Sequence, residues 1–77
     1  MPTLARFGAI YIRMYADDHR PPHFHIIGPK LQVLVRISDL TVIAGRARRS
    51  EIAAALAWAR QQQALLFHTW NVLNERD

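Results

Sequence analysis

The sequence predicts an α+β fold in which an antiparallel β-meander of four to five short strands packs against a long or broken C-terminal helix. Two observations predict this class. In the first half of the chain, short segments alternate apolar and polar residues, which is typical of half-buried antiparallel strands. From residue 47 onward, the apolar residues recur with the period of an amphipathic helix. Because 77 residues suffice for only one small core, we expect a single domain over residues 1–77.

The expected strands are short apolar segments bounded by glycine, proline or Ser-Asp turns. They cover residues 4–7, 9–15, 24–27, 31–37 and 40–44. The segment 9–15 alternates most clearly, and the face opposite its apolar side chains carries Tyr11, Arg13 and Tyr15. Tyr11 and Arg13 could stack on a nucleic-acid base or line a groove, although aromatic residues are also enriched in strands for packing alone.

The C-terminal segment carries two apolar stripes. The main stripe consists of Ile52, Leu56, Ala59, Leu66, Trp70 and Leu73. Since no glycine or proline follows residue 46, a single helix of about 28 residues would be roughly 42 Å long, which exceeds the width of so small a domain. We therefore expect it to bend or break near residues 61–63, or to project against another subunit. A second stripe of Trp58, Leu65 and Val72 favours a homodimer, unless both stripes pack on one sheet.

The charge balance favours an anionic partner. Ten Lys and Arg residues oppose six Asp and Glu residues, which gives a net charge of +4. Arg46, Arg48 and Arg49 form the tightest basic cluster, directly before the helical segment. Cations at a helix N-terminus oppose the macrodipole, so these side chains are better suited to bind phosphate or carboxylate than to stabilise the helix. An ordinary solvated surface is the alternative interpretation.

Composition also excludes some classes. The chain has no cysteine and therefore no disulfide framework. It contains no apolar run of about 20 residues, which a membrane-spanning helix would need, and its first residues lack the apolar stretch of a signal peptide. We therefore expect a cytoplasmic protein without a membrane partner.

The segment 17–25 holds three of the four histidines and the dipeptide Pro21-Pro22. Each proline fixes its own φ and pushes the preceding residue into extended conformations, which predicts a rigid corner. His23 and His25 are two residues apart at the start of a strand, so both rings should point to one face, with Phe24 toward the core. An extended Pro-Pro unit would hold the rings of His19 and His23 roughly 12 Å apart.

Three interpretations of this corner remain open. In the first, His23 and His25 chelate a divalent metal such as zinc, with Asp17, Asp18 and His19 as local candidates for further ligands. No other cofactor is expected. A single metal could reach all three histidines only if the corner folded back on itself.

The second interpretation is catalytic. His19, His23 and His25 would transfer protons while Arg20 stabilises a phosphorane-like charge, as in a ribonuclease-type hydrolase or transesterase. No serine or cysteine nucleophile accompanies the histidines, so the sequence favours a protein that is not an enzyme without deciding the matter. In the third interpretation, the histidines only bond backbone carbonyls and Asp18 caps a turn.

The chain resembles the DUF4160 family of small bacterial proteins. The resemblance covers nearly the whole chain, including Met1-Pro2-Thr3 and the twelve-residue spacing of Trp58 and Trp70. Its most specific part is the motif Asp18-His19-Arg20-Pro21-Pro22-His23-Phe24-His25. The resemblance implies a component of a toxin–antitoxin-like module, encoded near a second small protein, but no established activity.

These observations give two hypotheses of function. The first is a binding component of such a module, which holds a partner protein or nucleic acid through its basic surface and the histidine corner, with Asp18 among the binding residues. The second is a small ribonuclease-type toxin that uses the histidines as acid–base or metal-binding groups.

Overall fold

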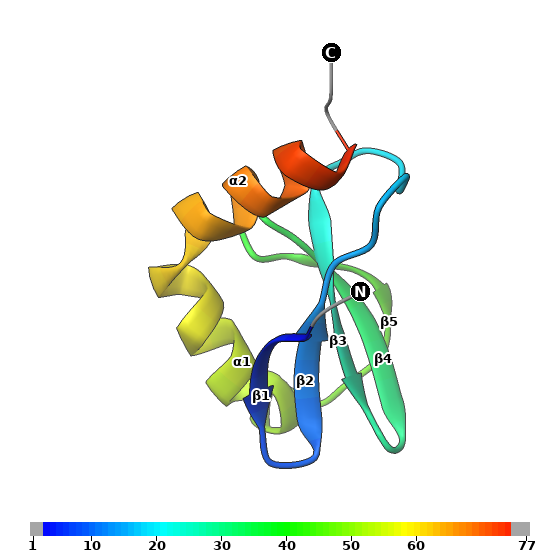
Figure 1. Ribbon diagram of the computed structural model, residues 1–77. Coiled ribbons are helices and arrows are strands. Elements are labelled where there is room, and N and C mark those ends of the chain that lie inside the picture. Colours follow the sequence, from blue (N-terminus) through cyan, green and yellow to red (C-terminus); the bar gives the residue numbers. More distant parts are fainter. Residues whose placement is uncertain (1–2, 75–77) are drawn as a thin grey trace.

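The computed structural model describes residues 3–74, and it confirms the predicted α+β class. Five antiparallel strands form one sheet in the order β1-β2-β3-β4-β5, and two helices follow (Figure 1). The elements are β1 (Thr3–Phe7), β2 (Ile10–Arg13), β3 (His23–Gly28), β4 (Leu31–Arg36), β5 (Val42–Gly45), α1 (Arg49–Gln61) and α2 (Gln63–Asn74). Met1 and Pro2, which contribute to the family resemblance, lie outside the described residues.

The strand register places the apolar side chains in one layer. Ile12 of β2 lies opposite Ile26 of β3, which in turn lies opposite Val33 of β4. All three side chains are completely buried. Because side chains alternate along a strand, this register gives one continuous apolar face across the three central strands.

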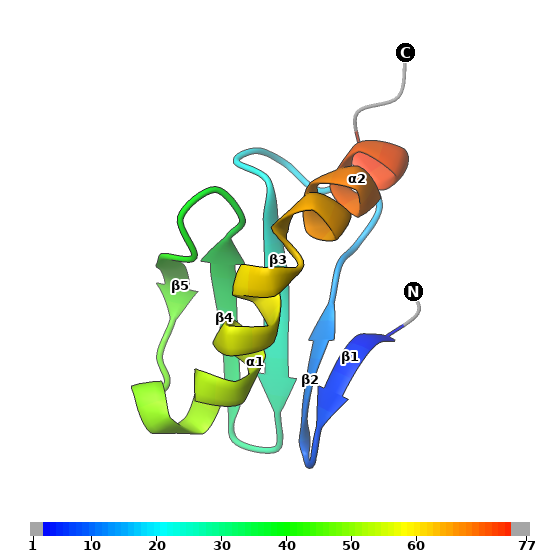
Figure 2. The ribbon, with the colours of Figure 1, turned by 90° about the vertical axis from the view of Figure 1, so that its left-hand side faces the viewer.

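The helix α1 packs across that apolar face, and α2 lies at the end of the sheet where β3 begins, so helices and sheet form two layers around one core (Figure 2). The helices contribute Ile52, Ala55, Ala59, Leu66 and Trp70 to the core. Burial of a large apolar side chain is worth about 1.5–3 kcal/mol, so the sheet and helices stabilise each other.

The helical segment breaks where the sequence predicts a break. Gln62 separates the two helices, with φ −120° and ψ 24°. The side-chain amide of Gln63 donates hydrogen bonds to the carbonyl oxygens of Ile37 and Ser38, at 2.7 and 3.3 Å. These bonds attach the start of α2 to the end of β4, so the chain turns over the sheet and does not project.

The second apolar stripe divides between core and surface. Trp58 is half-buried, and its ring meets that of Phe7 edge-on at 6.4 Å between centroids. The side chains of Leu65 and Val72 remain 45% and 56% exposed. Formation of a homodimer through this stripe stays a prediction. Within residues 3–74, neither helix combines the length and apolar composition that a membrane crossing requires.

Candidate functional site

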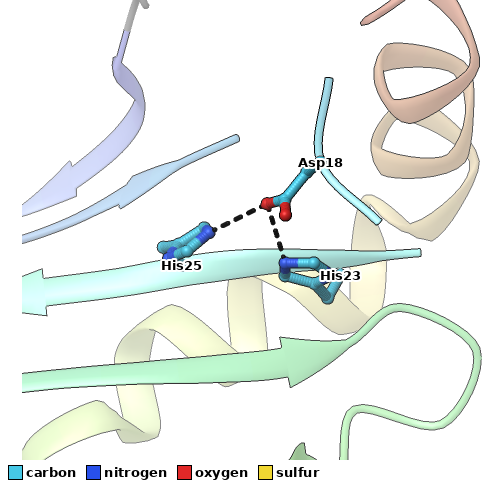
Figure 3. A group of neighbouring side chains, drawn as sticks. All are labelled: Asp18, His23 and His25. Carbon is cyan, nitrogen blue, oxygen red and sulfur yellow. Dashed lines mark hydrogen bonds and ion pairs between the residues drawn. The ribbon is translucent and has the colours of Figure 1, made fainter. Parts of the chain in front are cut away.

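Asp18, His23 and His25 converge on one point beside the start of β3 (Figure 3). The Nε2 atom of His23 lies 3.0 Å from Oδ2 of Asp18, and Nε2 of His25 lies 3.4 Å from the same oxygen. The two imidazole rings are 5.3 Å apart between centroids. The alternation of β3 produces this pairing, because His23 and His25 share one face of the strand while Phe24 enters the core.

A network of hydrogen bonds holds Asp18 in position. Asp17 adopts the left-handed conformation, with φ 59°, and turns the chain. The backbone N–H of Asp18 donates to Oδ1 of Asn74 at 2.6 Å, and Nδ2 of Asn74 donates to the carbonyl of Tyr15 at 3.1 Å. The N–H of His19 donates to Oδ1 of Asp18 at 3.0 Å, so Oδ2 is the oxygen left to face the histidines.

The corner is tighter than an extended Pro-Pro unit would be. The rings of His19 and His23 are 6.4 Å apart between centroids, so the expected separation of about 12 Å is wrong. The physical reason is that the chain doubles back over residues 17–22, where Asp18 is fastened to the end of α2. The peptide bond between Arg20 and Pro21 is cis.

The two inner histidines are buried. His23 is 2% exposed and His25 9% exposed, so neither ring presents an open face to solvent. The ring of Trp70 lies 5.2 Å from that of His23, and the ring of Tyr15 meets that of His25 edge-on at 4.6 Å. The physical reason is that α2 and the chain before the corner cover both rings.

Burial and hydrogen bonding set the charge states in the corner. Burial raises the pKa of Asp18, but hydrogen bonds from His25 and from the His19 N–H, with the positive fields of His23 and His25, hold that pKa below its ordinary value. Burial lowers the pKa of His25 more than its bond to Asp18 raises it. Near neutral pH the corner therefore presents a carboxylate beside a neutral His25 imidazole.

The other predicted corner residues lie on its outer side. The side chain of His19 is 94% exposed, and its Nδ1 atom is 3.6 Å from Oδ1 of Asp18. Asp17 and Arg20 are exposed as well. His68 lies in α2 and is exposed, away from the three converging side chains.

Tyr11 and Arg13 lie together on β2, on the sheet face opposite α1. The guanidinium of Arg13 is 5.0 Å from the centre of the Tyr11 ring, and that of Arg6 is 4.9 Å from it. Arg13 also pairs in register with His25. The tyrosine therefore contacts arginines of its own sheet, and its predicted role in binding a base remains a prediction.

The cluster of Arg46, Arg48 and Arg49 borders a cleft between β5 and α1. Its volume is about 610 Å³, and Arg49 and Arg60 are among its lining residues. Arg46 and Arg48 line an adjoining hollow that shares Val42 with the cleft. The backbone N–H of Arg48 donates to the carboxylate of Glu51 at 2.8 Å, so an acidic residue of the first turn offsets the basic cluster at the start of α1.

Sequence reasoning missed two residues of the corner. Asn74 is 56 positions from Asp18, and nothing in the local sequence distinguishes it from a solvent-exposed asparagine at a helix end. Trp70 was identified only as a core residue of the helical stripe. Its contact with His23 depends on the angle at which α2 crosses the sheet, which no local signal encodes.

The fold and the corner define a small two-layer α+β domain that carries a partly buried Asp-His-His cluster at one end of its sheet. Residues 9–71 match the model of the family described as "Domain of unknown function (DUF4160)", and the chain belongs to that family. No curated protein and no solved structure shows significant similarity to the chain.

Proposed function

We propose that this domain is the binding component of a toxin–antitoxin-like pair and that it holds an acidic segment of a second small protein in the cleft between β5 and α1. The observation that supports this proposal is the combination of apolar and arginine side chains around one cleft. The role as a component of such a pair comes from the family resemblance, and the cleft gives it a physical basis.

The cleft offers both apolar contact and charge. Leu40, Val42 and Leu56 line it, and the side chain of Val42 is 39% exposed. Arg49 and Arg60 are eleven positions apart on α1, which places them on one side of the helix about 16 Å apart. A segment with apolar side chains between acidic ones would satisfy both features.

The edge of the sheet borders this cleft. β5 is an edge strand because, within residues 3–74, it pairs with β4 alone, and all four of its residues are exposed. An edge strand presents unpaired backbone N–H and C=O groups, which an extended partner segment could bond. Ile43, 37% exposed, adds apolar surface on the same strand.

The second candidate, a metal-free ribonuclease, has less support. An acid–base mechanism needs two groups that reach the RNA backbone from different sides of the reacting phosphate. His23 and His25 are buried, and both point at Asp18, whereas His19 alone of the three is exposed. The corner therefore does not offer the paired, accessible imidazoles that this reaction requires.

The proposal is tested by isothermal titration calorimetry of the full chain with a small protein encoded next to its gene, which is the kind of partner that the family resemblance implies. We expect a one-to-one complex, which the double substitution Arg49→Glu plus Arg60→Glu weakens at least about tenfold because it places like charges against the acidic segment. Lys30→Glu is the matched control. It reverses an exposed charge in the turn between β3 and β4, and it should leave affinity unchanged within about twofold.

A single-stranded RNA of twelve nucleotides is titrated in parallel by fluorescence anisotropy. The proposal is wrong if the RNA binds with an affinity that falls steeply with salt while the neighbouring protein does not bind. In that case the arginines bind the phosphates of a nucleic acid. The proposal is equally wrong if Lys30→Glu weakens the protein complex as much as the double substitution does.

A further inference from the structure

The geometry points to a binding site for one divalent transition metal, best matched by Zn²⁺, with Oδ2 of Asp18 and the Nε2 atoms of His23 and His25 as ligands. This inference is independent of the proposed partner, because the corner and the cleft share no residues. One ligand atom from each of the three residues lies within 4.8 Å of the others.

The distances from Asp18 to the two histidines fit a tetrahedral centre. Zinc bonds of about 2.0–2.1 Å at tetrahedral angles place ligand atoms roughly 3.3–3.4 Å apart. The oxygen of Asp18 is 3.0 Å from His23 Nε2 and 3.4 Å from His25 Nε2. These two separations match a zinc centre within a few tenths of an ångström, while the ligand nitrogens of His23 and His25, which lie within 4.8 Å of each other, would close around the ion.

The bonding of His23 leaves a place for a cation at this point. Its Nδ1 atom lies 2.8 Å from the carbonyl oxygen of Pro21, and because a carbonyl only accepts, Nδ1 carries the hydrogen. In the neutral ring, Nε2 then holds a lone pair and faces the negative Asp18 oxygen. Among the described residues, this buried Nε2 has no hydrogen-bond partner, because its approach to Asp18 lacks hydrogen-bond geometry. A metal ion between the two atoms would turn this repulsion into two bonds.

The surroundings orient the ligands as metal sites require. Ligating histidines usually donate their second N–H to a carbonyl or carboxylate, and the bond from His23 to Pro21 is of this kind. The second oxygen of Asp18 is occupied by the His19 N–H, and the backbone of Asp18 is fixed by Asn74. Nδ1 of His25 has no partner among the described residues, so we expect His25 to be the weaker of the two histidine ligands.

The ligand types select the metal. Two imidazole nitrogens and one carboxylate oxygen suit zinc, cobalt, nickel or copper, whereas Ca²⁺ and Mg²⁺ prefer sites made of oxygen alone. Three protein ligands leave one tetrahedral position for water or an exogenous ligand. The Asp18 side chain is 18% exposed, which gives the site contact with solvent on its side of the corner.

The test uses the tag-free full chain after dialysis against a chelator. Addition of Co²⁺ should produce the visible absorption of a tetrahedral centre, with one ion per chain and an affinity of roughly 10 μM or tighter, and Zn²⁺ should displace it. Saturating Zn²⁺ should raise the thermal midpoint by several degrees, because the ion binds the folded chain. If Co²⁺ gave no visible absorption band and Zn²⁺ did not raise the thermal midpoint, the inference would be overturned.

Substitutions locate the ion. Asp18→Asn, His23→Gln and His25→Gln should each weaken Co²⁺ binding at least about tenfold, while His68→Gln, at an exposed position of α2, should not change it. Circular dichroism identifies any variant that fails to fold, and Asp18→Asn, at the most exposed ligand, keeps the test decisive if the buried histidine variants unfold. Binding that survives in folded Asp18→Asn at the wild-type affinity would refute the site.

Discussion

Asn74 joins the first third of the chain to its last helical turn through one side-chain amide. Its oxygen accepts from the Asp18 N–H, and its nitrogen donates to the Tyr15 carbonyl. Both hydrogen bonds are partly buried. They hold Tyr15 and Asp18, the first and last residues of the segment that leads into the histidine corner. Asn74 therefore positions the backbone of Asp18, although its two hydrogen bonds go to neither histidine.

We predict that Asn74→Ala lowers the free energy of unfolding by about 1–2 kcal/mol, because two partly buried backbone groups lose their partners. Urea denaturation monitored by circular dichroism measures this change. Thr69→Ala is the matched control, since the hydroxyl of Thr69 bonds only the Leu65 carbonyl within α2, at 2.8 Å. Equal effects of the two substitutions would show that Asn74 does not fasten the corner.

At the scale of the elements, the edge strand β5 depends on a glycine. Gly45 has φ +83°, and a Cβ atom built there would collide with the backbone carbonyl of Gln32 on β4. Gly8, in the turn between β1 and β2, has a similar φ of +63°, but a Cβ atom there meets nothing within 4 Å. The two positions share a backbone conformation that disfavours other residues and differ in the space around it.

We predict that Gly45→Ala destabilises the fold more than Gly8→Ala. The substitution at Gly8 should cost about 1–2 kcal/mol from backbone conformation alone. The substitution at Gly45 should carry the same backbone cost and a further cost, because the new Cβ atom would push β5 away from the Gln32 backbone of β4. Urea denaturation of both variants gives the comparison, and hydrogen exchange of the β5 amides locates the damage. If the two variants lose similar amounts of unfolding free energy, β5 can move away from β4 at little cost and the prediction is wrong.

The turn between β4 and β5 is held by an ion pair. The guanidinium of Arg36 donates to both oxygens of Asp39, at 3.0 and 2.6 Å, and the N–H of Thr41 donates to the same carboxylate. The hydrogen bonds from Arg36 are the main reason that the pKa of Asp39 lies well below its usual value of 3.8. A carboxyl with a depressed pKa stabilises the folded chain only while it is ionised.

We therefore predict that Asp39→Asn lowers the thermal midpoint by a few degrees at pH 7, with a difference that stays constant down to about pH 4. Below the ordinary pKa of 3.8, the unfolded chain binds a proton that the folded carboxylate does not, so the wild-type advantage shrinks as the pH falls further. Thermal scans from pH 7 to pH 2.5 measure it. If the difference in thermal midpoint between the wild type and Asp39→Asn grew as the pH fell, the depressed pKa of Asp39 would be contradicted.

At the scale of the whole molecule, one sheet supports two sites that share no residues. The histidine corner lies where the start of β3 meets the C-terminal end of α2 (Figure 1), while the residues that line the arginine cleft come from β5, α1 and the loop before β5. The helix break at Gln62 makes this arrangement possible, because α1 covers one part of the sheet and α2 turns toward the corner. An unbroken helix could not reach both.

Much of the fold could be predicted because its signals are local. Alternation in residues 10–14 and 31–37 identifies the buried faces. The length of the helical segment indicates either a bend or break near residues 61–63 or a projecting helix, and the structure shows the break. The pairing of His23 with His25 follows from strand alternation. The third member does not, because Asp17, Asp18 and His19 are equivalent in sequence and differ only in how the corner folds back.

The sequence by itself determined the class of fold, the meander of strands and the shared face of two histidines. Each of these depends on the spacing of neighbouring residues, which the chain carries whatever its environment. Only the tertiary structure decided that Asp18 faces those histidines, that Asn74 and Trp70 enclose them, and that Arg60 joins the basic cleft. Those contacts join segments far apart in sequence, and packing of the helices on the sheet sets their distances.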